Sequence, residues 1–359
     1  MQVFMIIAIL APASLPAPDS PLRLPLETSE YCRTLQPLAG GVAYVDSSLR
    51  PKVLSPDSLL SHPLELDWGP AEDGWDWSGE VMLLESSPDG SLVCLGLCVG
   101  LSDSLRPAGH YAMDPLLLVV CGADGSDARP VGLTLLVGRG PGFEFTADSR
   151  FLYGSPLLDC DPHPREYRST LMEGMPSSSD EHLIEVAGGA RSGSCAGLLA
   201  DGFLPSPWSD LAAAGACPPD LIVDVTSGEV LVEDTTGCGI LYEWVLPDAG
   251  LAREGHRQVL RFADGGAWTN PGEELRVHLR LDDGRYLFSR GPSSDVLLGE
   301  IDWHDFSADG AVGLPGLTEG MVDGVVTEAG EPGMILFVED GAVWVYRSTL
   351  LCCDAGEAE

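Results

Sequence analysis

Basic side chains are scarce in this sequence of 359 residues. Lysine and arginine together number 19 against 55 acidic residues, the formal net charge is −36, and Lys52 is the only lysine. Nucleic acids and anionic membrane surfaces are bound by clustered lysine and arginine, so we expect no nucleic-acid partner. The acidic excess instead favours solubility, salt tolerance or cation binding. A G+C-rich genome would also deplete lysine and asparagine, and Asn270 is the only asparagine.

Apolar runs long enough to cross a membrane are also missing, since a spanning helix needs about 20 apolar residues. The run from Val3 to Ala11 has the length of a signal-peptide core, and small residues with proline follow it. Cleavage sites are Ala11-Pro12-Ala13 or Leu15-Pro16-Ala17, although Met1 and Gln2 supply no basic charge. We predict a signal peptide over residues 1–17 and an exported, periplasmic or extracellular monomer without membrane insertion. The alternative is a buried N-terminal strand.

The ten cysteines include no Cys-x-x-Cys pair, which argues against a zinc ribbon or a thioredoxin-like site. An even number suits an oxidising compartment. Cys94 and Cys98 fall in one expected strand, where four residues span about 13 Å, beyond the limit of roughly 7 Å for a disulfide. Adjacent Cys352 and Cys353 would point to opposite faces of a strand. Any disulfide is therefore expected to be long-range, and other cysteines to be small buried apolar residues.

Helix-period segments are nearly absent, and short apolar or alternating runs separated by turn residues predict β-strands instead. Asp-Gly between apolar runs is a strong hairpin signal. Hairpins or strand pairs of this kind are expected at Glu80–Gly100, Pro115–Gly138, Gly142–Pro156, Asp220–Asp234, Val277–Arg290 and Gly333–Ser348.

One hairpin element recurs as SSPDGSLVCLG, EFTADSRFLYG, RLDDGRYLFSR and DFSADGAVGL. It resembles the hairpin of WD-repeat-like β-propellers and is similar in particular to the exported, periplasmic Tol-type propeller repeat, over about Leu66 to Leu350. Asp264 and Asp309 lie 45 residues apart, the length of one four-stranded blade. Asp89 and Asp148 are 59 apart, however, and Asp283 and Asp309 only 26.

The resemblance implies an all-β fold, a β-propeller with six or seven irregular four-stranded blades. Residues 18–359 would form a single domain with loop insertions near residues 159–180 and 196–219, which are rich in Pro, Ser, Gly and Ala. The alternative is a pair of β-sandwich-like domains that meet near residues 176–180.

The acidic segment from Asp67 to Glu80 is the first candidate ligand site. Clustered tryptophans and carboxylates suit carbohydrate or cationic ligands, through stacking and attraction of positive charge. Packing of the aromatic rings between blades is the structural alternative. The candidate ligand-binding residues are Trp68, Trp75, Trp77, Asp73 and Asp76.

A second candidate site is Asp159-Cys160-Asp161-Pro162-His163. Aspartate and histidine bind Zn²⁺ or Mn²⁺, and paired aspartates bind Ca²⁺, so Asp159, Asp161 and His163 are the candidate metal ligands. The alternative is a solvated acidic turn, and no EF-hand pattern is present.

Two glycine-containing motifs are expected to be loops. Gly193-Ser194-Cys195-Ala196-Gly197 has the spacing of a nucleophile elbow with cysteine in place of serine, but no strand–helix pattern surrounds it. Gly138-Arg139-Gly140-Pro141-Gly142 runs into another strand, so no helix N-terminus is available for phosphate. We therefore predict no catalytic residues from these motifs.

Together these observations predict an exported, non-catalytic binding or scaffold protein for a protein or carbohydrate ligand. The alternative is a propeller hydrolase or lyase that uses channel carboxylates, with a divalent cation such as Ca²⁺ as its only cofactor. Two convergent carboxylates in the channel would favour the enzyme, and an apolar or neutral channel would exclude it. A third interpretation, an envelope interaction protein of a salt-rich habitat, predicts stability that rises with salt.

Overall fold

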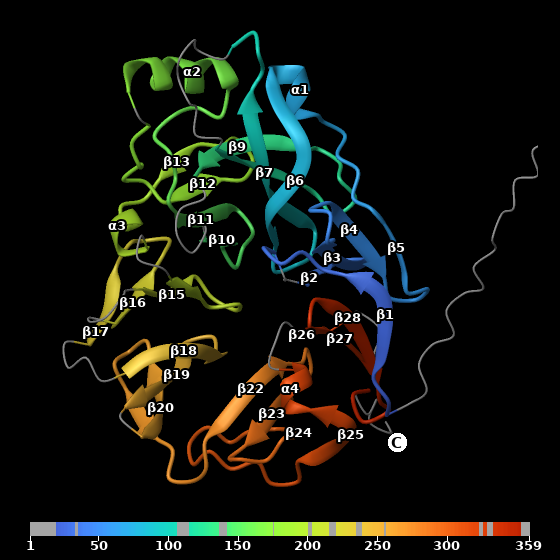
Figure 1. Cartoon of the computed structure of the whole chain (residues 1–359). Helices are drawn as coiled ribbons and strands as arrows, with labels where there is room; N and C mark the ends of the chain where they lie inside the picture. The colour runs from blue at the N-terminus through green and yellow to red at the C-terminus, as the bar shows by residue number, and fades with distance from the viewer. Residues whose placement is uncertain are drawn as a thin grey trace, which may run out of the picture.

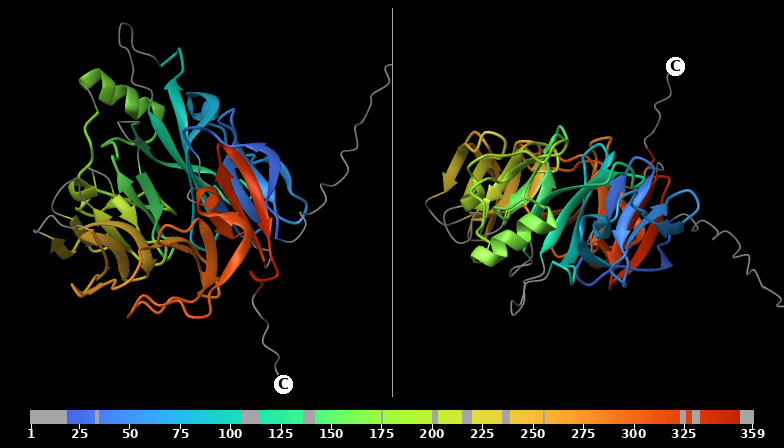
Figure 2. Two further views of the ribbon diagram at one scale, coloured as in Figure 1. Left: turned by 60° about the horizontal axis from the view of Figure 1, so that its bottom comes forward. Right: turned by 90° about the horizontal axis from the view of Figure 1, so that it is seen from above.

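The chain folds into a seven-bladed β-propeller. A computed structural model describes residues 19–32, 35–105, 115–135, 142–174, 176–199, 203–214, 220–234, 239–254, 256–322, 326–328 and 333–352. These residues form seven antiparallel sheets of four strands each, arranged in a ring around a central opening (Figure 1). Seen from the side, the ring is a flattened disc (Figure 2). The predicted propeller is therefore confirmed, with seven blades, and the two-sandwich alternative is wrong.

Blades 1 to 6 each contain four consecutive strands, and in every blade we call the strands a to d from the channel outward. In chain order the blades are β2 (Gln36–Leu38), β3 (Gly41–Val45), β4 (Pro51–Ser55), β5 (Leu60–Pro63); β6 (Trp75–Ser86), β7 (Leu92–Leu101), β8 (Leu116–Gly122), β9 (Arg129–Thr134); β10 (Gly142–Phe145), β11 (Phe151–Ser155), β12 (Leu183–Glu185), β13 (Arg191–Ser192); β14 (Phe203–Pro205), β15 (Leu211–Ala214), β16 (Asp220–Asp224), β17 (Val230–Asp234); β18 (Gly239–Leu246), β19 (Ala249–Glu254), β20 (Arg257–Phe262), β21 (Ala267–Thr269); and β22 (Leu275–Arg280), β23 (Tyr286–Arg290), β24 (Asp295–Gly299), β25 (Val312–Thr318).

Blade 7 joins the two ends of the chain. It consists of β26 (Val326–Glu328), β27 (Met334–Glu339), β28 (Ala342–Arg347) and, as its outermost strand, β1 (Leu22–Glu27). β1 pairs antiparallel with β28, and Leu22 lies opposite Val345. The Ser348 hydroxyl donates to Asp19 Oδ1 at 2.6 Å. The N-terminal strand therefore closes the ring with backbone hydrogen bonds.

The recurring hairpin element is the turn between strands a and b in blades 2, 3 and 6. In blade 2 the Asp89 carboxylate accepts hydrogen bonds from the Ser87 hydroxyl at 2.6 Å and from the Ser91 amide at 3.0 Å. Gly90 has a φ of 66°, which glycine adopts without strain. In blade 3 Asp148 accepts from the Thr146 hydroxyl at 2.8 Å in the same way. These aspartates therefore shape the turns.

The fourth copy, DFSADGAVGL, occupies a different turn. It lies between β24 and β25, strands c and d of blade 6, so the assignment of Asp309 to the same position as Asp283 is wrong. Asp264 lies between β20 and β21, the same turn of blade 5, which explains its 45-residue distance from Asp309. Asp283 and Asp309 are only 26 residues apart because they belong to one blade.

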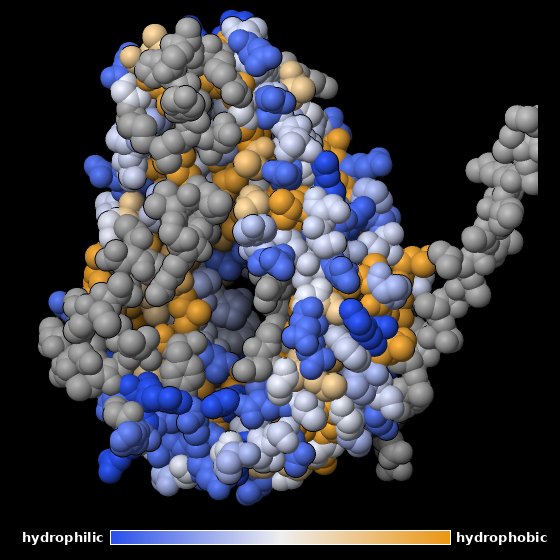
Figure 3. All heavy atoms as spheres, in the orientation of Figure 1, coloured by the Kyte–Doolittle hydropathy of each residue, from blue (hydrophilic) through white to orange (hydrophobic). Residues whose placement is uncertain are grey.

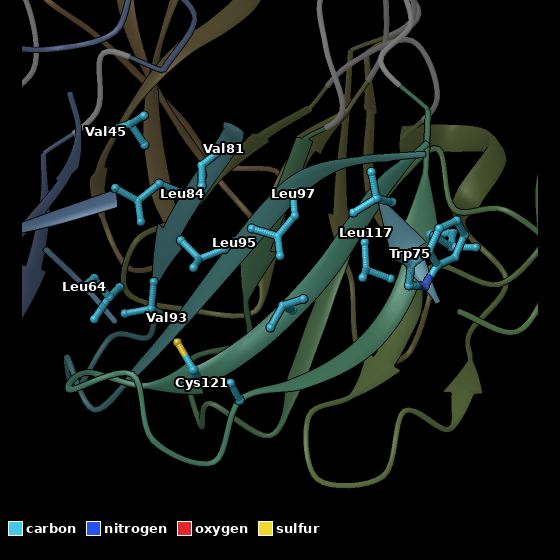
Figure 4. Packing of buried hydrophobic residues seen from close by; sticks show 14 of the residues in the cluster. Val45, Leu64, Trp75, Val81, Leu84, Val93, Leu95, Leu97, Leu117 and Cys121 are labelled. Carbon is cyan, nitrogen blue, oxygen red and sulfur yellow. The ribbon is translucent and has the colours of Figure 1, made fainter. Parts of the chain in front are cut away.

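The hydrophobic core lies between the blades. Seven clusters of buried side chains each join two neighbouring sheets. The largest, between blades 1 and 2, includes Val45, Leu95, Leu97 and Leu117, all fully buried (Figure 4). At about 25 cal/mol per Å² of buried apolar surface, this packing is the main stabilising contribution to the ring.

The described residues include four short or medium helices: α1 (Pro70–Asp73), α2 (Pro164–Glu173), α3 (Ala196–Leu199) and α4 (Glu319–Val322). α2 lies in the connection from β11 to β12, and α3 in the connection from β13 to β14. No helix in the ranges given above is long and apolar enough to cross a membrane. The predicted signal peptide, residues 1–17, lies outside the described residues, and the domain limits stay a prediction.

Among the cysteines that the structure describes, Cys94 and Cys121 are free thiols buried among apolar side chains. Burial raises the pKa of the Cys121 thiol to about 12. These thiols therefore serve as small packing residues. Cys217, Cys238 and Cys353 lie outside the described residues.

Candidate functional site

The three tryptophans of the acidic segment are engaged within the protein. Trp75 is 2% exposed, its Nε1 donates to the Pro162 carbonyl at 3.1 Å, and its ring packs 5.6 Å from that of Tyr167. A buried ring cannot stack on a ligand, so Trp75 is a core residue.

Trp68 and Trp77 are half-buried against the same core cluster. Trp68 Nε1 donates to Asp73 Oδ2 at 3.2 Å, and Trp77 Nε1 donates to the Glu80 carbonyl at 3.2 Å. Asp76 is exposed. None of these residues lines the cavity described below, and their role in ligand binding stays a prediction.

The three candidate metal ligands precede α2 in the chain, and His163 is its N-cap residue. Asp161 Oδ1 accepts from the His163 amide at 2.9 Å, and His163 Nδ1 accepts from the Arg165 amide at 3.2 Å, so His163 caps the helix. Asp159 is exposed. Among the residues that the structure describes, no three His, Cys, Asp or Glu side chains are grouped to hold a metal. The predicted metal site therefore gains no geometric support.

The Cys195 motif does have a strand before it and a helix after it, β13 and α3, contrary to expectation. The Cys195 amide donates to His182 Nδ1 at 3.1 Å. His182 Nε2 lies 2.6 Å from the Val225 carbonyl and 2.9 Å from Cys195 Sγ. Gly193, at a φ of +91°, makes room for the ring, because a Cβ there would lie 2.3 Å from His182 Cε1.

This pair is a structural link and not a nucleophile with its base. Nδ1 of His182 accepts a hydrogen bond from the Cys195 amide and Nε2 faces the Val225 carbonyl, so the proton of the neutral ring is on Nε2. The ring therefore has no free acceptor for the thiol proton. Burial raises the pKa of Cys195 to about 11 and lowers that of His182, which keeps both groups neutral. The link joins blade 3 to Val225 of blade 4.

A cavity of about 530 Å³ opens where the a–b turns of the blades meet at the channel. Its lining comes from blades 1, 2, 4, 5 and 6 and includes Pro37, Asp89, Trp208, Glu243 and Arg280. We call it the channel-mouth cavity. The space-filling view shows the centre of the ring hollowed (Figure 3). Because most blades contribute to it, this is the place where the fold can build a composite site.

The channel-mouth cavity combines aromatic rings with polar groups. The Arg280 guanidinium lies 5.2 Å from the centre of the Trp208 ring, and Arg280 Nε is buried without a hydrogen-bond partner. Trp244 Nε1 donates to the Leu204 carbonyl at 2.9 Å. Burial raises the pKa of Glu243 to about 8. Such a mixture is typical of small-ligand sites.

Two glutamates stand on neighbouring innermost strands beside this cavity. Glu85, on β6, accepts a hydrogen bond from Gln36 Nε2 of β2 at 2.8 Å, while the Ser86 hydroxyl donates to Gln36 Oε1 at 3.1 Å. Burial raises the pKa of Glu85 well above its usual range, and the charge of Glu144, on β10, adds to this effect. Burial likewise raises the pKa of Glu144 to about 7.

Tyr153 lies directly opposite Glu144 across β10 and β11. Its side chain is 1% exposed, and its hydroxyl has no hydrogen-bond partner. Desolvation, followed by the charges of Glu144, Asp210 and Glu85, raises its pKa. The structure thus places two carboxyl groups and a neutral phenol close together.

Sequence reasoning missed these residues, although a signal was present. Glu85 stands four residues before Asp89 in ESSPD, and Glu144 four residues before Asp148 in EFTAD. The shared spacing places both glutamates at the same position of strand a, next to the channel. Alignment of the hairpin copies on their aspartates would have found them.

No family model and no curated protein matches this chain. Among solved structures, it is similar to the computationally designed Ika8 protein, with a TM-score of 0.44, 10% identity and coverage of 90% of this chain and 98% of that one. It is also similar to a chain of the mitotic checkpoint complex, with a TM-score of 0.38, 13% identity and coverage of 97% of this chain and 98% of that one. For BamB from Moraxella catarrhalis, the TM-score is 0.42 and the identity 11%, with coverage of 92% of this chain and 97% of that one. The seven sheets themselves establish the fold.

Proposed function

We propose that this protein is a non-catalytic binding protein whose ligand occupies the channel-mouth cavity. The observation that carries the proposal is the composite lining of the cavity, in which Trp208, Glu243 and Arg280 from three blades meet in about 530 Å³. Aromatic faces with a few polar groups suit an extended peptide or an oligosaccharide. Such ligands span several blades at once.

Thermal unfolding with two named probes, cellotetraose and tetra-alanine, tests this function. We expect one of them to raise the midpoint temperature of unfolding, because binding to the folded state stabilises it. The rise should disappear in Trp208→Ala and persist in Trp268→Ala, whose ring is 39% exposed on the outer strand β21. A rise with neither probe, or an equal rise in both variants, would contradict the proposal.

We also propose that the protein is exported, on the basis of the apolar run at residues 3–11. Expression of the full chain in a Gram-negative host tests this. The exported fraction should contain a chain that begins at Ser14 or Pro18 by mass spectrometry. An uncleaved chain confined to the cytoplasm would contradict export.

The convergence of Glu85 and Glu144 favours one further function, acid–base catalysis by a hydrolase. A carboxyl group with a pKa of about 7 suits proton transfer at neutral pH. Hydrolysis of p-nitrophenyl β-glucoside, lost in both Glu85→Gln and Glu144→Gln, would support it. Absence of turnover, or turnover unchanged in these variants, would contradict it.

A further inference from the structure

We propose that Glu85, Glu144 and Tyr153 form a binding site for the primary ammonium group of a ligand. The inference rests on the proposed function, because the rest of that ligand would occupy the channel-mouth cavity. It assigns a chemical class to the ligand and a role to three residues outside the cavity lining.

Among the residues that the structure describes, no basic side chain pairs with either carboxyl group. Other glutamates pair with arginine, as Glu254 does with Arg261 and Glu319 with Arg276. Within the described ranges, neither Glu85 nor Glu144 makes a salt bridge. The neutral amide of Gln36 is the hydrogen-bond donor to Glu85, and it occupies one of the two carboxylate oxygens. Charge of one sign gathered in a partly desolvated place attracts a cation.

The hydroxyl of Tyr153 is the second, independent observation. Opposite residues of an antiparallel pair project from the same face of the sheet, so Tyr153 and Glu144 are direct neighbours. A buried hydroxyl without a partner is unfavourable, and native proteins seldom retain one. The propeller fold does not require a hydroxyl at this position, because blade 2 has Cys94 at the equivalent position, opposite Glu85. The phenol is therefore available to bind a ligand.

The number and type of acceptors favour an ammonium group over a metal ion. A primary ammonium carries three N–H donors, and the site offers two carboxylates and a phenol oxygen as acceptors. Calcium takes about six to eight oxygen ligands. Gln36 Oε1, on the amide that donates to Glu85, already accepts from the Ser86 hydroxyl.

The carboxyl groups are accessible to solvent and lie close in the chain to residues that line the channel-mouth cavity. Glu85 and Glu144 are partly exposed, whereas Leu84, Phe143 and Phe145 beside them in the strands are buried. Pro37 follows Gln36 directly and lines the cavity. A ligand seated in the cavity can therefore extend its charged end toward the carboxyl pair.

A titration with n-butylammonium, followed by ligand-detected NMR at constant ionic strength, tests the proposal. We expect saturable binding that weakens at least about tenfold in Glu144→Gln and about threefold in Tyr153→Phe, which retains the ring and removes one acceptor. Glu229→Gln is the matched control, because Glu229 is an exposed glutamate in the turn between β16 and β17. It removes the same charge and should leave binding unchanged.

Tetramethylammonium and Ca²⁺ are the competing probes. Tetramethylammonium is a cation without an N–H donor, so it should bind the wild type more weakly than n-butylammonium does. Three results would overturn the proposal: no saturable n-butylammonium binding, equal loss in the Glu229 control, or tighter binding of Ca²⁺ that depends on Glu144. If Glu144→Gln does not fold, the binding of n-butylammonium to Tyr153→Phe tests the proposal instead, and unchanged binding would overturn it.

Failure of the ammonium site and failure of the proposed function give different results in these experiments. Loss of n-butylammonium binding with retention of a Trp208-dependent response to cellotetraose or tetra-alanine would overturn the ammonium site alone. The reverse result would overturn the assignment of the cavity and leave the ammonium site in place.

Discussion

In two hairpins, a glutamate and an aspartate lie four positions apart, and their pKa values are shifted in opposite directions. The carboxylate of Asp89 accepts hydrogen bonds from Ser87 and Ser91, and these lower its pKa. Desolvation alone would raise the pKa of Asp148, but hydrogen bonds from Arg150 and Thr146 outweigh it and the pKa is lowered. Glu85 and Glu144, on the strands that lead into these turns, have raised pKa values.

In these two hairpins, a carboxylate is stabilised in its ionised form only where its own turn supplies hydrogen-bond donors. At the turn, the ionised aspartate orders the backbone and remains in contact with water. On the innermost strand, the glutamate loses water and gains few hydrogen bonds, so its ionisation opposes folding. A position that opposes folding and is kept accessible is a reasonable place for ligand binding.

The largest change in stability is expected at a third buried titratable group, His182. Both of its ring nitrogens have hydrogen-bond partners. His182→Ala removes the acceptor of the Cys195 amide and the neighbour of the Val225 carbonyl. We expect the free energy of unfolding to fall by about 3 kcal/mol, because two buried polar groups lose their partner and a cavity forms. Urea denaturation measures this, and a loss below about 1 kcal/mol would contradict the structural role.

Glu144→Gln should raise the free energy of unfolding, whereas His182→Ala lowers it. Because the folded-state pKa of Glu144 is raised to about 7 from 4.5, the folded protein binds the proton more tightly than the unfolded chain. Stability therefore falls as pH rises from 4.5 toward 7, and the variant escapes this loss. We expect a gain of about 1–3 kcal/mol near pH 8 and no gain below about pH 4.5. Denaturation at both pH values checks this, and a destabilised variant near pH 8 would contradict it.

Asp89→Ala should destabilise the protein by about 1 kcal/mol at neutral pH, because the turn loses the carboxylate acceptor. The lowered pKa of Asp89 means that its contribution is present above its ordinary value of 3.8 and is lost as pH falls through the folded-state pKa. The loss should therefore shrink in acid. Asp89→Asn, which retains an acceptor oxygen, is the matched control and should recover part of the stability.

The smallest effect concerns salt. With a net charge of −36, the folded chain repels itself, and salt screens this repulsion. The midpoint temperature should rise by a few degrees, roughly 2–5 °C, between low and molar NaCl. The rise should be smaller in Glu144→Gln, because one like-charge interaction with Glu85 is gone. An unchanged midpoint would count against a salt-rich habitat.

The sequence was sufficient to predict the propeller because its turns carry the signal. Ser87-Pro88-Asp89-Gly90 is a local pattern, and its bonds are formed within the turn. The position of Asp309 was misread because turns a–b and c–d both use Asp-Gly.

The site was harder to predict, because its residues come together only when the ring closes. Trp75 looked like a ligand platform, yet it packs on Tyr167, which is 92 residues further along the chain. Gln36, Glu85 and Glu144 are single polar residues in three separate strands, and their proximity depends on the order of the blades. The charge-rich segments stand out in the sequence, whereas the proposed site consists of isolated polar residues on inner strands.

The central claim is that Glu144 and Asp148, in one hairpin, are shifted in opposite directions. A carbon-detected NMR titration of both side-chain carboxyl groups in the full chain measures it directly. The account predicts a pKa of about 7 for Glu144 and a value below 3.8 for Asp148. Titration of both groups near their ordinary values would contradict it.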